Sequence, residues 1–447
     1  MHRVCLALPT DRACAATIAE LGAEAAYAVR AFDGVEVHLV VLDTSGPAVL
    51  AGNRAAVDAL PPVPGVTVHH LDERRQREFL HEAVRRSGVV EADRLHRLLL
   101  PDGVSYGACT DRLFLVARAL GCVSVHRRDS DGRYQHHDGA PLFPVHHELA
   151  TLGRRAADVA AAGLVTRSRL DPALADRRVV LAGGSFIGEM SVDLDGIRQA
   201  DPEVYREVVG LWIPADCPEP WRRGLVEESF RGSRAAPFTG DLTTLTTVSP
   251  MRVDMCNIAF AEDVYARVPL PPATDTIGTD YFLTHLVHDA RLPGVQHNRD
   301  IVNHYTAERR TGPGFLAYQL RFVRFLLSMR YFHALYARFR AAPDDLLDAT
   351  GRVRAAAVAA HVRETLRLDR AENVHRLDVL DRSYRKLGGR YASVADALTA
   401  ERGSLLDRAE EDMADFAFLI ETWHPLMRAA PSAVTRLLED PRPPSRR

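Results

Sequence analysis

Three short apolar segments in the first seventy residues constrain the fold most strongly. They cover residues 4–8, 35–42 and 66–70, and each has the length and composition of a buried strand. Helical patterns separate them, and the first of these repeats apolar residues on one face: Ile18, Leu21, Ala25 and Val29. Strands that alternate with helices predict an α/β layered domain with a largely parallel sheet.

Acidic residues follow the predicted strands at the ends where ligands bind in such sheets. Asp11 and Asp43 come shortly after the first two strands, and Asp129 and Asp131 follow a further apolar run over 122–125. Ligands of open α/β sheets bind beyond the carboxyl ends of the strands. We therefore expect these carboxylates to surround a binding site.

The segment Asp129-Ser130-Asp131 places two carboxylates one residue apart. In an extended chain, side chains two positions apart point the same way. Paired carboxylates suit Mg²⁺ or Mn²⁺, and such an ion is usually shared with substrate phosphates. A solvated turn is the alternative, and it accounts for most matches to so short a motif. The acidic residues at the other strand ends favour the metal site.

A helix is predicted to begin near Ser105 and to run through Leu120. Its start offers free backbone N–H groups and Arg112, which together suit an anion. The alternative is an ordinary helix capped by Thr110 or Asp111. The sequence leaves both interpretations open.

Several motifs then occur in a fixed order along the chain. They are Pro9-Thr10-x-Arg12, Asp43-Thr44-Ser45, Ala119-x-Gly121, Asp129-x-Asp131, the segment 256–265, Thr279-Asp280 and Val302-Asn303-His304. In this order they resemble the GT-A glycosyltransferases, in particular the family 2-like group. The whole chain also resembles an actinobacterial group of glycosyltransferase-like proteins. The resemblance covers roughly residues 3–310, although 141–250 match no particular segment of the family.

The resemblance implies a GT-A-type, Rossmann-like mixed sheet flanked by helices, and a role for each motif. Asp129 and Asp131 would hold Mn²⁺ or Mg²⁺ together with His304, to which His297 is the neighbouring alternative. The residues expected to contact a nucleoside-diphosphate sugar are Pro9, Thr10, Arg12, Asp43, Arg112, Arg128, Asp129, Asp131, Gly184, Asn257 and Arg309.

Asp280 is implied to be the general base that deprotonates an acceptor hydroxyl. The family has a glutamate before this aspartate, whereas Thr279 stands there in this chain. The alternative role for Asp280 is a helix N-cap, with Thr279 able to cap in its place. Asp275 is the fallback base.

Two other features have paired interpretations. Gly184 lies in a glycine-rich turn that either lines the sugar or acceptor pocket or is plain structure. Arg309 and Arg310 either neutralise the diphosphate of the donor or form a solvated basic pair.

The predicted catalytic domain covers residues 1–311, with a nucleotide-sugar half over 1–140 and an acceptor half over 141–311. A helical C-terminal region is expected over 312–438, followed by a disordered tail over 439–447. Apolar residues at helical spacing predict helices in that region over 315–332, 352–368, 371–387 and 393–423.

Composition limits the classes of function. A net charge of -3 creates no field that favours nucleic acid or an anionic membrane surface. Six cysteines lack metal-binding spacing and are expected to be reduced thiols of a cytoplasmic protein. The most apolar segment, 315–332, contains three arginines, so we expect no membrane insertion. We also expect no signal peptide.

The predicted function is metal-dependent transfer of a sugar from a UDP- or GDP-sugar to a small-molecule acceptor, in bacterial specialised metabolism. A sugar nucleotidyltransferase is the alternative, although no glycine-rich loop containing lysine follows the first strand to hold a triphosphate. A non-catalytic nucleotide-sugar-binding protein is the third hypothesis, which Thr279 keeps open. The C-terminal helices are expected to shape the acceptor site or a homodimer.

Overall fold

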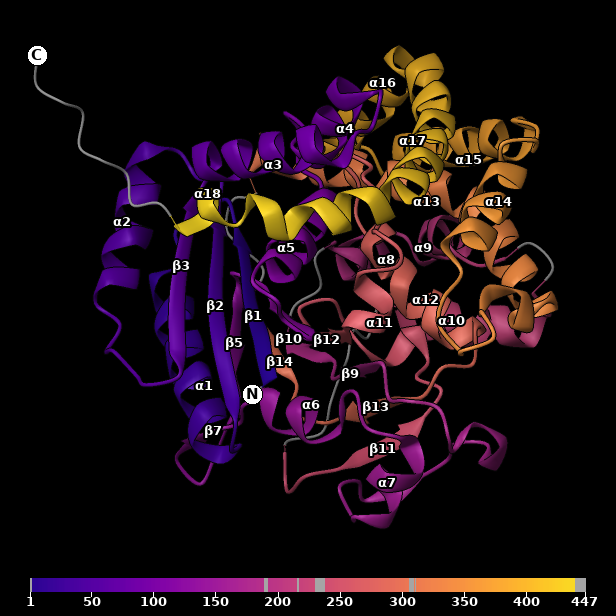
Figure 1. The fold of residues 1–447 in the computed structure, drawn as a ribbon. Coiled ribbons are helices and arrows are strands. Elements are labelled where there is room, and N and C mark those ends of the chain that lie inside the picture. The colour runs from indigo at the N-terminus through magenta and orange to yellow at the C-terminus, as the bar shows by residue number, and fades with distance from the viewer. Residues whose placement is uncertain are drawn as a thin grey trace, which may run out of the picture.

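The computed structural model describes residues 2–188, 192–214, 217–229, 238–304, 309 and 311–438. A mixed sheet is flanked by helices, and further helices pack together at the C-terminal end (Figure 1). The predicted fold class, an α/β mixed sheet with a helical C-terminal region, is confirmed. The predicted tail over 439–447 lies outside the described residues.

The N-terminal part of the main sheet is parallel. β1 (His2–Thr10) lies between β2 (Val35–Asp43) and β4 (Ser124–Arg128), and β3 (Val66–Asp72) follows β2 at the edge. Helices cover both faces of this sheet, so its strands are apolar on both sides. The three strands predicted near the N-terminus are confirmed.

Beyond β4 the sheet becomes mixed. β12 (Asn257–Ala261) runs antiparallel to both β4 and β9 (Leu181–Gly183), and β13 (Gly294–His297) is parallel to β9. The described strands follow the order β3-β2-β1-β4-β12-β9-β13-β11-β8, with β11 at Thr243–Thr246 and β8 at Arg167–Ser168.

A smaller sheet lies at the carboxyl end of β4. It contains β10 (Phe186–Gly188), β14 (Ile301–Asn303) and β5 (Gly132–Tyr134), and β5 begins directly after Asp131. The segment Asp129-Ser130-Asp131 therefore connects the two sheets. A short hairpin follows, formed by β6 (His136–His137) and β7 (Ala140–Pro141).

Two apolar cores lie on opposite faces of the main sheet. α1 (Ala15–Ala31) packs on one face, while α3 (Glu73–Ser87) and α5 (Tyr106–Ala119) pack on the other. The other described α-helices before residue 305 are α2 (Pro47–Asp58), α4 (Ala92–Leu99), α6 (Val145–Thr151), α7 (Ala156–Ala161), α8 (Leu194–Ala200), α9 (Pro202–Gly210), α10 (Glu219–Ser229), α11 (Glu262–Tyr265) and α12 (Phe282–Asp289).

The C-terminal region is helical, as predicted. Its helices are α13 (Gly312–Ala341), α14 (Ala355–Thr365), α15 (Ala371–Leu387), α16 (Ala392–Ala400), α17 (Arg402–Ala429) and α18 (Thr435–Leu438). The single helix predicted over 393–423 is in fact two helices, α16 and α17, separated at Glu401. No described helix is long and apolar enough to cross a membrane.

One apolar core extends across the predicted domain boundary after residue 311. Phe282 of α12 contacts both Phe332 of α13 and Phe416 of α17, with ring centroids 6.5 and 4.8 Å apart. Trp423 of α17 donates a hydrogen bond to the carbonyl oxygen of Tyr265, at 3.0 Å. The helical region is thus packed onto the sheet, and the division into domains stays a prediction.

Gly107 in the first turn of α5 fits closely against the loop around Pro271. A Cβ atom at Gly107 would lie 1.9 Å from the carbonyl oxygen of Pro271. We expect Gly107→Ala to lower the free energy of unfolding by about 3 kcal/mol, because the helix or the loop must move. Gly210→Ala is the control, since a Cβ there meets nothing within 4 Å. Urea unfolding of both variants checks this, and equal stabilities would contradict it.

Candidate functional site

A cavity of about 450 Å³ lies beyond the carboxyl ends of β1 and β4. It is the location expected for a ligand in this kind of sheet. Asp11 lines this cavity, as do eight of the residues predicted to bind the donor or a metal or to act as the base: Pro9, Thr10, Arg12, Arg112, Asp129, Asp131, Asp280 and Arg309. They come from the ends of two strands, the first turns of α5, the 3-10 turn Thr279–Tyr281, and the chain just before α13.

Arg127 links two of the cavity's carboxylates. Its guanidinium lies 2.9 Å from Asp280 Oδ2 and 3.1 Å from Asp129 Oδ1, and its side chain is only 3% exposed. Burial raises the pKa of Asp280, and the nearby charges of Asp129 and Asp254 raise this pKa further. The positive charge and hydrogen bond of Arg127 lower it. The pKa of Asp280 is raised overall. Asp280 does not act as the N-cap of the following helix. Gly278 is the cap residue of the 3-10 turn that contains Asp280, and Tyr281 is the cap residue of α12.

Asp131 is paired with a different set of arginines. Arg309 Nη2 lies 3.0 Å from Asp131 Oδ2, and Arg12 Nη1 lies 3.8 Å from the same oxygen. Burial raises the pKa of Asp131, and the neighbouring charge of Asp129 adds to this effect. The two aspartates of the motif thus face the cavity together, and each has its own guanidinium partner. Arg310, the other member of the predicted basic pair, lies outside the described residues.

Asp254 and Tyr281 are cavity residues that the sequence did not reveal. The Tyr281 hydroxyl donates a hydrogen bond to Asp254 Oδ2, and the backbone N–H of Cys256 donates to Asp254 Oδ1 at 2.9 Å. Tyr281 directly follows Asp280 in the sequence, and this neighbour relation could have indicated that Tyr281 lies at the cavity. Asp254 lies in a loop that matches no motif, and only the folded chain places it here.

The start of α5 is an ordinary capped helix. Ser105 is the N-cap, and its hydroxyl accepts a hydrogen bond from the N–H of Ala108 at 3.1 Å. The alternative in which Thr110 or Asp111 caps this helix is wrong, because the N-cap Ser105 lies five residues before Thr110. Arg112 lines the cavity, but its guanidinium donates to the side chain of Gln76 and to the carbonyl oxygen of Leu99.

Asp43 ends β2 but does not line the cavity. Its carboxylate is buried and has three polar partners. It accepts hydrogen bonds from the Asn53 side chain and from the backbone N–H of Ser45, both at 2.9 Å, and it lies 3.0 Å from His70 Nε2. These partners fix the turn after β2. Thr44, the next residue, lines the cavity instead.

Acid is expected to weaken the fold through Asp43. Burial raises its pKa, but the hydrogen bonds from His70, Ser45 and Asn53 outweigh burial and lower the pKa to about 2. The pKa of an aspartate in the unfolded chain is about 3.9. Ionised Asp43 therefore stabilises the fold fully above that pH, and this stabilisation is lost as the pH falls towards 2. Asp43→Asn should remove about 2 kcal/mol at neutral pH and flatten the acid dependence of urea unfolding. An unchanged dependence would contradict this.

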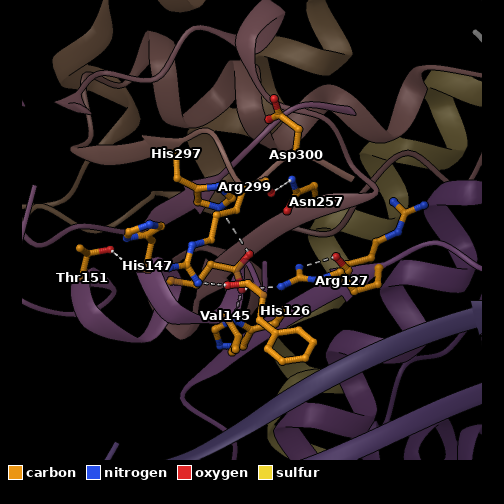
Figure 2. Close-up of polar contacts among 12 residues, drawn as sticks. His126, Arg127, Val145, His147, Thr151, Asn257, His297, Arg299 and Asp300 are labelled. Atoms are coloured by element: carbon orange, nitrogen blue, oxygen red, sulfur yellow. Dashed lines mark hydrogen bonds and ion pairs between the residues drawn. The ribbon is translucent and has the colours of Figure 1, made fainter. Parts of the chain in front are cut away.

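Arg128 points away from the cavity into a buried polar cluster. Its guanidinium lies 2.9 Å from both Glu24 Oε1 and Glu148 Oε2, and all three side chains are at most 2% exposed. His126 Nδ1 lies 2.7 Å from the same Glu148 oxygen. Figure 2 shows this cluster around His126, with Arg127 directed away from it. The predicted donor contact of Arg128 has no support in this geometry.

Gly184 and Asn257 also lie outside the cavity. The Asn257 side-chain amide donates hydrogen bonds to the carbonyl oxygens of Ser185 and Arg299, both at 2.9 Å. Figure 2 labels Asn257 and Arg299. A Cβ at Gly184 would lie 2.7 Å from the ring of His297. Asn257 therefore connects two loops, and Gly184 leaves the space in which Asn257 and His297 pack, which agrees with the structural alternative for the glycine turn.

Asp129 and Asp131 are the cavity residues that would hold a divalent ion shared with a substrate, and both are paired with arginines. Asp129 and Asp131 offer hard carboxylate oxygens, and such an ion takes its remaining ligands from phosphate and water. In the part of the chain that the structure describes, no three His, Cys, Asp or Glu side chains gather to hold a metal. His304 is exposed and does not line the cavity, so the structure does not join it to the two aspartates.

A model of the family of unknown function DUF6271 matches residues 2–438. The chain belongs to this family. No curated protein matches it. Among solved structures, a mycobacterial protein is 16% identical with a TM-score of 0.34, covering 73% of this chain and 74% of that one. The mannosyltransferase PcManGT from Pyrobaculum calidifontis, solved with GDP-mannose and Mn²⁺, is 12% identical with a TM-score of 0.33, covering 94% and 87%. Likenesses this distant do not establish an activity.

Proposed function

We propose that this protein is a glycosyltransferase that moves a sugar from a nucleoside-diphosphate sugar, UDP- or GDP-linked, to a small-molecule acceptor. One observation carries the proposal: a single cavity at the strand ends contains Asp129, Asp131 and Asp280 together with Arg12 and Arg309. Glycosyl transfer needs groups that stabilise a leaving diphosphate and a base for the acceptor, and both kinds of group are present.

The two arginines at Asp131 are suited to the diphosphate. A guanidinium can bind two phosphate oxygens at once. Arg12 and Arg309 approach the same carboxylate oxygen from the first strand's loop and from the chain before α13. When bound, a Mg²⁺ or Mn²⁺ ion on Asp129 and Asp131 would supply Lewis acidity to the departing phosphates.

Asp280 is the proposed base for the acceptor hydroxyl. It lies on the other side of Arg127 from Asp129, so one buried guanidinium fixes both carboxylates. A base needs a fixed geometry close to the proton that it removes. The Arg127 side chain provides that geometry, and Tyr281 and Asp254 complete the adjoining wall.

Titration calorimetry with UDP and with GDP, each with and without Mn²⁺, tests the donor site. We expect one nucleotide to bind in a metal-dependent way, and Asp129→Ala/Asp131→Ala to weaken that binding by about a hundredfold, because both the metal ligands and a partner of Arg309 are lost. Asp344→Ala/Asp345→Ala removes the same charge from an exposed pair and should bind like the wild type. Binding that is absent, or indifferent to metal and to Asp129 and Asp131, would contradict the proposal.

A further inference from the structure

The long helix α13 contributes an arginine to the cavity wall. Arg321 lines the cavity together with Tyr106 of α5 and Arg309. The Tyr106 and Tyr318 hydroxyls lie 3.2 Å apart, and Tyr318 is one turn before Arg321. The guanidinium groups of Arg309 and Arg321 lie 4.6 and 4.9 Å from the centroid of the Tyr318 ring. One aromatic ring thus holds two cations at the cavity.

Arg321 differs from the other arginines of the cavity in its partners. Each of the others has a carboxylate, carbonyl or amide oxygen: Arg12 and Arg309 have Asp131, Arg77 has Glu73, Arg112 has Gln76, and Arg127 has Asp129 and Asp280. Arg321 has no ion pair or hydrogen bond within the described chain, and its contact is the Tyr318 ring. It is half-buried.

Partial burial removes some of the water around the Arg321 guanidinium, and no counter-ion within the described chain replaces it. The ring face of Tyr318 restricts the guanidinium by a cation–π contact but accepts none of its five N–H donors. These donors are left for a group that enters the cavity. Planar, charged oxygen groups such as phosphate and carboxylate match them best.

We propose that Arg321 is a specificity-determining residue that binds an anionic oxygen group, phosphate or carboxylate, of a substrate in this cavity. The proposal rests on the proposed function only in taking the cavity as the substrate site. The anionic group belongs either to the donor diphosphate or to an acidic acceptor. The C-terminal helical region is thereby part of the binding site and not merely a support for the sheet.

Metal-free titration with inorganic pyrophosphate tests the subsite directly. We expect wild-type protein to bind pyrophosphate, Arg321→Gln to weaken it by about tenfold, and Arg321→Lys to fall between the two, because lysine keeps the charge but not the fork of donors. Arg338→Gln is the matched control, since Arg338 is an exposed arginine of the same helix outside the cavity, and it should bind like the wild type. Pyrophosphate binding that is absent in the wild type, or equal in Arg321→Gln, would overturn the proposal.

Nucleotide titrations then identify the source of the anionic group. If Arg321→Gln weakens UDP or GDP binding but leaves the nucleoside unaffected, the group is the donor phosphate. The alternative result is that Arg321→Gln leaves nucleotide binding unchanged, while nucleotide-saturated wild-type protein still binds inorganic phosphate and nucleotide-saturated Arg321→Gln does not. In that case the anionic group belongs to the acceptor. The pyrophosphate experiment uses neither nucleoside nor metal. Its failure would therefore overturn the role of Arg321 without affecting the donor site, which the nucleotide titration of Asp129→Ala/Asp131→Ala tests. Failure of the nucleotide titration would likewise leave the role of Arg321 standing.

Discussion

Replacing Arg128 with methionine is expected to lower the free energy of unfolding by about 4 kcal/mol, because it leaves two buried carboxylates without their shared cation. Glu24 and Glu148 are fully buried, and Arg128 lies 2.9 Å from each. Burial alone raises the pKa of Glu148, but Arg128 and His126 outweigh burial and hold this pKa well below its usual range. Without the arginine, one or both carboxylates must take up a proton or stay charged and unpaired. Urea unfolding at neutral pH measures the loss.

A surface ion pair provides the control for this prediction. Arg363 pairs with Glu421 on the outside of the helical region, where its side chain is 52% exposed. Arg363→Met should cost less than about 1 kcal/mol, because water solvates both charges when the pair is broken. Adding Glu24→Gln and Glu148→Gln to Arg128→Met should recover part of the loss, since glutamine remains an acceptor without the charge. A loss for Arg128→Met no larger than that of Arg363→Met would show that the cluster contributes little.

The sequence located this part of the chain but not the direction of its side chains. The segment 126–134 was identified from its two aspartates, and both aspartates do line the cavity. Alternation along β4 puts Arg127 and Arg128 on opposite faces. All five residues of β4 are buried, however, so hydrophobic patterning does not tell which face meets the cavity. The resemblance implied a donor contact for Arg128, and the pattern of buried residues could not correct it. In the structure Arg127 is the residue beside Asp129 and Asp280.

Other differences have the same physical origin, which is pairing between residues distant in sequence. Asp43 lies at a strand end, as expected, but His70 from the next strand and Asn53 from α2 bind its carboxylate. No local sequence pattern predicts that these two residues bind the Asp43 carboxylate. Arg321 joins the cavity because the start of α13 meets the start of α5 through Tyr318 and Tyr106, which lie about two hundred residues apart in the chain. Helix and strand positions follow local patterns, whereas the partners of buried charges depend on the complete fold.

Asp280→Asn is expected to abolish most of the sugar transfer while leaving donor binding nearly intact. Asparagine has the same shape and can still accept the hydrogen bond that Arg127 donates to Asp280 at 2.9 Å. It cannot accept the proton of an attacking hydroxyl, so the rate of nucleoside-diphosphate release from the UDP- or GDP-sugar should fall by about a thousandfold. Calorimetry of the same variant should give a nucleotide affinity within about threefold of the wild type, because the proposed donor contacts lie at Asp129, Asp131 and Arg309.

Asp275→Asn is the matched control for this substitution, because Asp275 is the other acidic residue considered as the base. It lies five residues earlier, does not line the cavity, and pairs with Arg324 at 3.5 Å. Its backbone has a φ of 50°, which asparagine tolerates. The control should keep its transfer rate. If Asp275→Asn loses activity and Asp280→Asn retains it, the base is not Asp280. If Asp280→Asn loses donor binding together with turnover, then Asp280 belongs to the donor site, and the ion pair with Arg127 serves to position the diphosphate and not the acceptor.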